Sequence, residues 1–317
     1  MDIVSCTDTN FVIPLGVMIH SLCVNNEREK LHFHIIIDDS VTDQQKDELR
    51  TVVSVADDIK FYLVDIEIIR QYLVVKVENF PVPIYYRLLM AKILPDPIHT
   101  VLYLDADIIV RHDLTELWNT PLDNVSVAAI PNQSDCGQYW DRLDYPKEIG
   151  YFNSGVLLLN LDYIRSNNLT DVFINYIKDN PQRLLCPDQD VLNYVLKDCK
   201  IMLPVRYNSQ EGFYRDPPEK TIGDKQTFES DISDPYIVHY TKEKPWMANC
   251  SHPLKNLYYY YKADTIWANN SFMEHFKYKK TDTSFGIRVK LYIAKMMRLL
   301  YSQKKDIIRY KEIHLNR

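Results

Sequence analysis

Short, almost wholly apolar segments that alternate with helical patterns constrain the fold of this 317-residue chain more than any other feature. The first three such segments are residues 2–7, 31–37 and 59–64, and helical patterns lie between them. Strands that are apolar along their whole length are typical of parallel sheets covered by helices on both faces. The pattern therefore predicts an α/β fold with a single mixed, mostly parallel sheet flanked by helices. A hydrophobic content of 46% is enough for a substantial core.

Later segments extend this pattern. Thr42 is expected to cap a helix, and a helix that contains Arg87 is expected to end near residue 94. Further strands are predicted at 101–104, 126–130, 155–159 and 236–240, and a further helix over 189–196. Residues 206–235 are rich in Pro, Gly, Asp and Ser, which predicts a surface loop region. We expect one large domain over residues 1–270 and a helical tail over 271–317.

Polar side chains follow three of the predicted strands at the points where the strands end. Asp8 and Asn10 follow the first strand, residues 38–39 follow the second, and Asp105 and Asp107 follow the strongly apolar segment 101–104. Ligands of open α/β sheets bind beyond the carboxyl ends of the strands, so these residues indicate a site. A carboxylate pair flanked by apolar sequence requires a partner, and Mg²⁺ or Mn²⁺ bridging to phosphate suits it.

The six cysteines are scattered, and none forms a C-x-x-C pair. This distribution argues against a disulfide framework or a zinc site and favours a reducing compartment. The N-terminus has no basic-then-apolar signal pattern, and the chain has no apolar run of about 18 residues. We therefore expect a cytoplasmic protein.

Charge is unevenly distributed along the chain. Residues 271–317 carry 12 Lys and Arg against 4 Asp and Glu, whereas the remainder carries 25 against 39. The acidic body argues against nucleic acid as a partner. In the tail, Val289, Ile293 and Met296 share one helical face, and Arg288 and Lys295 lie roughly opposite. Such a helix suits peripheral contact with the inner, anionic face of the cytoplasmic membrane, or else packs on the body with a solvated basic face.

Six segments, in consistent order, resemble the family 8 glycosyltransferases. This family includes bacterial lipopolysaccharide galactosyl- and glucosyltransferases and, more distantly, the glycogenins. The segments are residues 87–92, 101–110, 113–118, 151–155, 188–193 and 239–246. The resemblance spans residues 1 to about 250. It implies a GT-A type nucleotide-sugar-binding fold and an enzyme that moves glucose or galactose from a UDP-sugar to a glycan acceptor.

The resemblance also assigns roles to residues that bind the nucleotide. The end of the first strand would hold the uracil through Asp8 and Asn10, with Phe11 stacking on it. Arg87 would reach the diphosphate or the sugar of the donor. Taken alone, Arg87 also fits a solvated helix cation.

By the same resemblance, Asp105, Asp107 and His239 would bind Mn²⁺ or Mg²⁺, and Lys244 would neutralise the departing diphosphate. A neutral imidazole beside two carboxylates is a plausible Mn²⁺ ligand set. His239 and Lys244 are five residues apart without an intervening Gly, whereas the family usually has six with a Gly, so Lys242 is an alternative. His239 alone also fits a structural histidine.

Around the sugar, the resemblance implies contacts from Asn153, Ser154, Gly155 and Asp188, and it places Gln189 near the anomeric carbon. The resemblance implies retention of configuration, and because a primary amide is a poor nucleophile, front-side attack by the acceptor hydroxyl is favoured. Asp188 and Asp190 remain candidates for a covalent route, and Asp188 alone also fits a helix cap. Residues 130–135 give no match to an acidic sugar contact, so glucose and galactose both stay open. Alternatives to a lipopolysaccharide or capsule enzyme are a glycogenin-like self-glucosylating protein and a catalytically silent sugar-nucleotide-binding protein.

Overall fold

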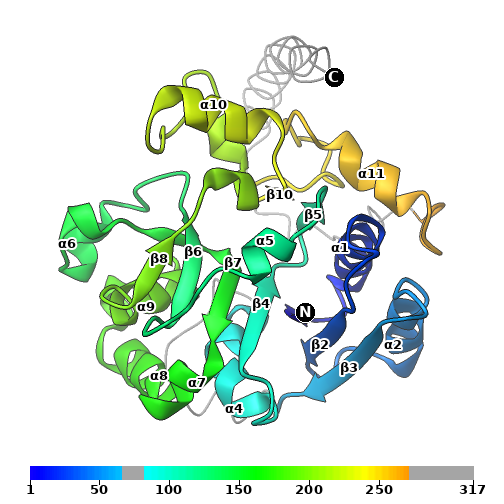
Figure 1. Ribbon diagram of the computed structural model, residues 1–317, viewed down its shortest axis with the longest axis horizontal. Helices are drawn as coiled ribbons and strands as arrows, with labels where there is room; N and C mark the ends of the chain where they lie inside the picture. Colours follow the sequence, from blue (N-terminus) through cyan, green and yellow to red (C-terminus); the bar gives the residue numbers. More distant parts are fainter. Residues whose placement is uncertain (66–81, 271–317) are drawn as a thin grey trace, which may run out of the picture. The chain divides into compact units, whose positions relative to one another are not determined.

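The computed structural model describes residues 1–65 and 82–270 (Figure 1). The chain divides into two compact units, Met1–His239 and Tyr240–Arg317, and each is described by itself. The predicted basic tail, residues 271–317, lies outside the described residues, so the boundary at residue 270 stays a prediction.

A seven-stranded sheet forms the centre of the first unit, in the order β3-β2-β1-β4-β7-β6-β8 (Figure 1). Its strands are β1 (Asp2–Thr7), β2 (His32–Ile37), β3 (Asp58–Leu63), β4 (Thr100–Leu104), β6 (Val127–Pro131), β7 (Phe152–Asn160) and β8 (Lys200–Met202). Strand β7 runs antiparallel to both of its neighbours, and all other pairs are parallel. The prediction of a mixed, mostly parallel sheet is confirmed.

A second, three-stranded sheet has the order β5-β10-β9. Its strands are β5 (Ile108–Val110), β9 (Ser209–Gln210) and β10 (Ile237–His239). The prediction of a single sheet missed it. Strands of two or three residues are too short to show a period in the sequence, so their pairing depends on contacts that local patterns do not encode.

Helices of the first unit flank the large sheet and connect its strands, whereas α11 belongs to the second unit. The α-helices are α1 (Val12–Asn25), α2 (Asp43–Arg50), α4 (Met90–Ile93), α5 (Thr115–Trp118), α6 (Tyr139–Leu143), α7 (Leu161–Ser166), α8 (Leu169–Asp179), α9 (Pro187–Val195), α10 (Lys225–Ser233) and α11 (Asn256–Lys262). The 3₁₀-helices are η1 (Val82–Leu89), η2 (Lys147–Ile149), η3 (Pro181–Arg183), η4 (Val205–Tyr207) and η5 (Glu211–Tyr214). The predicted cap of α2 is confirmed, because the Thr42 hydroxyl accepts from the Gln45 amide at 3.2 Å and the Gln45 side chain accepts from the Thr42 amide at 3.0 Å.

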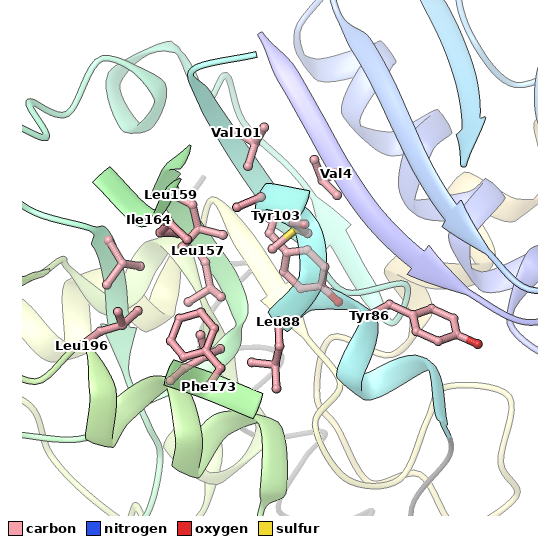
Figure 2. Packing of buried hydrophobic residues seen from close by; sticks show 14 of the residues in the cluster. Val4, Tyr86, Leu88, Val101, Tyr103, Leu157, Leu159, Ile164, Phe173 and Leu196 are labelled. Atoms are coloured by element: carbon pink, nitrogen blue, oxygen red, sulfur yellow. The ribbon is translucent and has the colours of Figure 1, made fainter. Parts of the chain in front are cut away.

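Alternate residues of the central strands form the core of the first unit. Val4, Val101, Tyr103, Leu157 and Leu159 pack against side chains from η1, α7, α8 and α9 (Figure 2). The intervening residues, such as Ile3 and Leu102, point to the other face and are equally buried. Burial on both faces explains why these segments are apolar throughout.

Residues 206–235 are only in part the surface loop that their composition predicts, because residues 215–224 form an irregular, bent stretch that is exposed or half-buried whereas residues 207–214 are buried. The segment contains η4, β9, η5 and α10, and Asn208, Ser209 and Gln210 are fully buried. The Gln210 side chain donates to the Pro131 carbonyl and accepts from the Gln133 amide, both at 2.9 Å. Burying polar groups that are hydrogen-bonded in this way costs little free energy, so the polar composition of the segment did not require it to be exposed.

In the second unit, the described residues end at 270. Helix α11 lies here, and the Tyr240 hydroxyl donates to the Leu254 carbonyl at 2.9 Å. The Lys244 ammonium donates to the Tyr240 carbonyl at 2.5 Å. In the part of the chain that the structure describes, no helix has both the length and the apolar character needed to cross a membrane.

Candidate active site

The carboxyl ends of β1, β2 and β4 lie at one edge of the large sheet, because these three neighbouring strands are parallel. Asp8 follows the last residue of β1. Its carboxylate accepts hydrogen bonds from the Asn10 backbone amide at 2.9 Å and from the Asn10 side-chain NH₂ group at 3.2 Å. Phe11 follows this turn and precedes the first residue of α1. The structure thus confirms the polar strand edge, and the uracil contacts of these three residues stay predictions.

The chain leaves the large sheet after Leu104, turns over residues 105–107, and enters the second sheet at Ile108. Strand β10 runs antiparallel to β5, and its last residue, His239, pairs with Ile108. This pairing brings His239 beside the turn. The His239 Nε2 atom lies 3.2 Å from an Asp107 oxygen and 3.8 Å from an Asp105 oxygen. One ligand atom from each residue lies within 4.8 Å of the others.

A chain of hydrogen bonds fixes which nitrogen of His239 faces these carboxylates. The Gly155 amide can only donate, so the Asn153 side-chain atom at 3.0 Å from it is the carbonyl oxygen. That oxygen also accepts from the Asn208 NH₂ group at 2.9 Å, which leaves the Asn208 oxygen to accept from His239 Nδ1 at 2.9 Å. Nδ1 therefore carries the proton, and the lone pair of a neutral imidazole points from Nε2 toward Asp105 and Asp107.

This arrangement fits a divalent metal ion. A lone pair opposite two carboxylates is repulsive unless a cation, either a proton or a metal ion, lies between them. Asp105 and Asp188 lie beside the Arg87 guanidinium, and Asp107 lies beside His239, so these three carboxylates and one guanidinium carry a formal charge of −2 when all are ionised. Two oxygens and one imidazole nitrogen are a suitable set for Mn²⁺ or Mg²⁺.

Gly155 makes room for this group of ligands. A Cβ atom at this position would lie 2.2 Å from His239 Cε1 and 2.7 Å from an Asp105 oxygen. The Gly155 carbonyl also accepts from the Asp105 amide at 2.9 Å, so the backbone here cannot simply withdraw. We assign Gly155 a steric role in the ligand group, which the sequence did not indicate.

Arg87 is buried beneath the turn, with 8% of its surface exposed, which rules out a solvated helix cation. Its guanidinium lies 2.8 Å from Asp105 Oδ1 and 3.3 Å from an Asp188 oxygen, and it donates to the Ser154 carbonyl at 2.9 Å. Burial is the largest single influence and lowers the pKa of Arg87, but the neighbouring groups, first among them the Asp105 carboxylate, together more than compensate, so this pKa is well above its ordinary value. The Tyr103 hydroxyl donates to the same Asp105 oxygen at 2.7 Å. Asp105 is thus held in place from two sides.

Helix α9 begins at Pro187, so Asp188 and Gln189 occupy its first turn and neither one is the cap. Both side chains are buried. The Asp188 carboxylate accepts from the Ser154 hydroxyl at 2.9 Å, and burial raises its pKa. The Gln189 oxygen accepts from the Ser154 amide at 3.0 Å and from Asn153 at 3.1 Å. The predicted sugar-binding residues thus contact one another, and Arg87 connects Asp188 and Ser154 to Asp105.

Asp190 has different surroundings from those expected of a nucleophile. It is fully buried and its two oxygens accept from five donors. Two come from Arg142, at 2.6 and 2.7 Å, and one from the Tyr151 hydroxyl at 2.5 Å. The backbone amides of Leu185 and Cys186 supply the others. A carboxylate with this many donors has little nucleophilic capacity, so we assign Asp190 a structural role and correct the expectation of a covalent route through it.

Asn208 and Tyr103 were missed by sequence reasoning. Asn208 lies within the segment whose composition predicted a loop, and Tyr103 was counted only as an apolar strand residue. Neither has a spacing that distinguishes it from ordinary loop or strand residues. Lys244 lies in the second unit, so its predicted role at the diphosphate stays a prediction.

The chain is similar in sequence to several bacterial proteins. The chain is 32% identical to general stress protein A of Bacillus subtilis, over 84% of this chain and 94% of that protein. It is 32% identical to a lipopolysaccharide 1,2-glucosyltransferase of Escherichia coli, over 75% and 71%, and 26% identical to a lipopolysaccharide 1,3-galactosyltransferase of Salmonella typhimurium, over 83% and 77%.

Among solved structures, the galactosyltransferase LgtC in complex with donor and acceptor sugar analogues has a similar fold. The TM-score is 0.75 at 22% identity, and the similarity covers 84% of this chain and 96% of that one. The predicted GT-A fold is confirmed. The profile of one family, described as glycosyl transferase family 8, matches residues 2–250. The motifs that suggested this family lie within that range, and the chain belongs to glycosyl transferase family 8.

Proposed function

We propose that this protein is a retaining hexosyltransferase. It moves glucose or galactose from a UDP-sugar to a glycan acceptor of the lipopolysaccharide or capsule type, and it uses Mn²⁺ or Mg²⁺. The observation that carries the proposal is the group Asp105, Asp107 and His239, in which the hydrogen-bond chain through Asn208 directs the Nε2 lone pair toward both carboxylates. The similarity to lipopolysaccharide glucosyl- and galactosyltransferases supports the acceptor class.

When bound by these three side chains, a divalent ion would stabilise the negative charge that develops on the departing diphosphate. The protein's own part is to hold the ligands. Arg87 and Tyr103 both bind Asp105 Oδ1, which leaves Oδ2 facing His239. Asn208 orients the imidazole. Ligands that are already held in place do not have to reorganise during the reaction. This preorganisation is the main source of the stabilisation of the transition state.

The surroundings of Gln189 support retention without a covalent intermediate. Its oxygen is engaged by two donors from residues 153 and 154, so the group it can offer to a substrate is the NH₂, a hydrogen-bond donor. A donor near the sugar can orient a hydroxyl, but it cannot attack carbon 1. The acceptor hydroxyl is then the nucleophile, and the leaving phosphate accepts its proton.

Removing one metal ligand tests this proposal. We expect Asp107→Asn to lower donor-dependent UDP release at least about 100-fold, because replacing a ligand exceeds the effect of disturbing an outer-shell partner. UDP release would be measured with UDP-glucose, UDP-galactose and their N-acetyl forms, with and without Mn²⁺. Asp96→Asn, an exposed carboxylate in the loop before β4, is the matched control. Unchanged turnover of Asp107→Asn would contradict the metal assignment.

The same incubations separate the alternatives. Intact mass measured after incubation with donor alone would reveal added hexose units if the protein glucosylates itself. A silent binding protein would show donor binding without UDP release from any of the four donors.

Asn208→Leu tests the orientation of His239. The variant removes the acceptor of the Nδ1 proton, and we expect the Mn²⁺ dissociation constant to rise about 10- to 100-fold. Titration calorimetry without donor measures this directly. Asn208→Asp keeps an oxygen for the imidazole and should lose less affinity. Ser209→Ala, which removes a buried hydrogen bond to Tyr214 but does not touch His239, controls for local destabilisation. Equal loss in all three variants would show that Asn208 acts only through folding.

A further inference from the structure

Two cysteines that are distant in the sequence touch in the folded chain. The sulfur atoms of Cys136 and Cys186 are 3.1 Å apart, although the residues are separated by 50 positions. Cys136 lies between β6 and α6, and Cys186 immediately precedes the first residue of α9. The scattered cysteines argued against a disulfide framework, and their spacing gives no sign of this contact. The contact is therefore a product of the fold.

Buried contacts hold both cysteines where they are. Arg142 donates to the Cys136 carbonyl at 3.0 Å and forms the ion pair with Asp190. The other oxygen contacts of Asp190 include the Cys186 amide at 2.8 Å. The Arg142–Asp190 ion pair thus binds the backbone of both cysteines, Cys136 through Arg142 and Cys186 through Asp190. Cys136 and the following Gly137 both have left-handed backbone angles, φ of 41° and 67°, so the turn that presents the Cys136 sulfur is already formed.

The two thiols differ in their surroundings. The hydrogen bond from Cys186 is the largest influence on Cys136 and lowers its pKa, and Tyr151 and Arg142 act in the same direction. The same contact raises the pKa of Cys186. Both side chains are half-buried, so a small reagent can reach them. A thiol with a lowered pKa and a neighbouring second thiol is the arrangement that reacts with thiol oxidants.

We propose that Cys136 and Cys186 form an oxidisable dithiol, a modification site whose reagent is a low-molecular-weight disulfide. The Cys136 thiolate attacks one sulfur of the reagent R–S–S–R, which releases R–S⁻ and leaves Cys136–S–S–R. Cys186 then loses its proton to solvent, attacks the Cys136 sulfur and expels the second R–S⁻. The protein loses two electrons and two protons, and the reagent is reduced to two thiols.

The resulting bond would join the segment after β6 to the residue before α9, whose first turn carries Asp188 and Gln189. A disulfide bond is about 2.05 Å long, so the sulfurs need to approach by only about 1 Å. Any consequence for turnover rests on the proposed function, whereas formation of the bond does not. The bond also closes a loop of 50 residues, which restricts the unfolded chain and should raise the melting temperature.

The test uses the full chain with oxidised glutathione as the reagent and without donor or metal. Remaining thiols are blocked with an alkylating agent, and the intact mass gives their number. We expect the six thiols to fall to four, a linked peptide that contains Cys136 and Cys186, and a higher melting temperature that dithiothreitol reverses. Cys186→Ser should instead trap glutathione on Cys136. Cys199→Ser is the control, because the Cys199 sulfur contacts Ser126, and this variant should still form the linked peptide.

Retention of six thiols by the folded chain, under conditions in which the urea-unfolded chain reacts, would overturn the proposal. So would a linkage between any other two cysteines. Because the thiol count needs neither donor nor metal, its result is independent of whether UDP release is observed.

Discussion

Gly155→Ala is expected to abolish Mn²⁺ binding and to lower UDP release at least about 100-fold, although it adds only one methyl group. The added carbon would overlap His239 Cε1 at 2.2 Å and an Asp105 oxygen at 2.7 Å. Neither side chain can move without breaking other contacts, since Asn208 holds the imidazole and Arg87 holds the carboxylate. The methyl group therefore separates two of the three proposed ligands. Titration calorimetry with Mn²⁺ and no donor measures the loss.

A second crowded glycine provides the control. In Gly212→Ala the new carbon would lie 2.7 Å from the side-chain oxygens of Gln133 and Glu219, and its three nearest atoms all belong to these two residues rather than to a proposed ligand. Its Mn²⁺ affinity should match that of the unmodified protein, and its melting temperature reports the general cost of such crowding. Gly155→Ala binding Mn²⁺ with normal affinity would mean that the three side chains are not the ligands.

The sequence predicts those parts of the fold that are encoded by local pattern. The strands β1, β2 and β4 are apolar throughout because both of their faces are buried, and the Thr42 capping box is a signal within four residues. The positions of Asp105 and Asp107 at a strand end follow from the same pattern. His239 could be joined to them only through the family resemblance, because it lies 132 positions after Asp107 in the sequence.

The remainder of the site depends on contacts that no local pattern carries. Asn208 is polar and lies among turn-forming residues, so its complete burial beside His239 becomes apparent only when β9 and β10 pair. The Cys136–Cys186 contact depends on the path of both backbones around Asp190. Asp190 was a candidate for a covalent route within the resembling segment 188–193, and only its five donors identify it as structural.

Arg142→Met is expected to lower the free energy of unfolding by about 3 kcal/mol. Removing one partner of a buried ion pair leaves an uncompensated charge, which costs about 3–5 kcal/mol. We expect a loss at the lower end of this range, because the Tyr151 hydroxyl and two backbone amides still donate hydrogen bonds to Asp190. Methionine keeps most of the length of the arginine side chain, so the change is chiefly one of charge. Urea denaturation of the reduced chain measures the difference.

The matched control, Arg50→Met, breaks an ion pair of similar length in solvent. Arg50 lies 2.6 Å from Asp47 and is half-exposed, and exposed pairs of this kind contribute about 0–1 kcal/mol. Asp190 has no exposed surface, and Arg142 has 17% of its side chain exposed. The difference between the two variants therefore reports the burial of the Asp190 ion pair together with the Arg142 hydrogen bonds to the Arg183 and Cys136 carbonyls. Equal destabilisation would show that the Asp190 network does not anchor the start of α9, and the fixed geometry of Asp188 and Gln189 would then need another source.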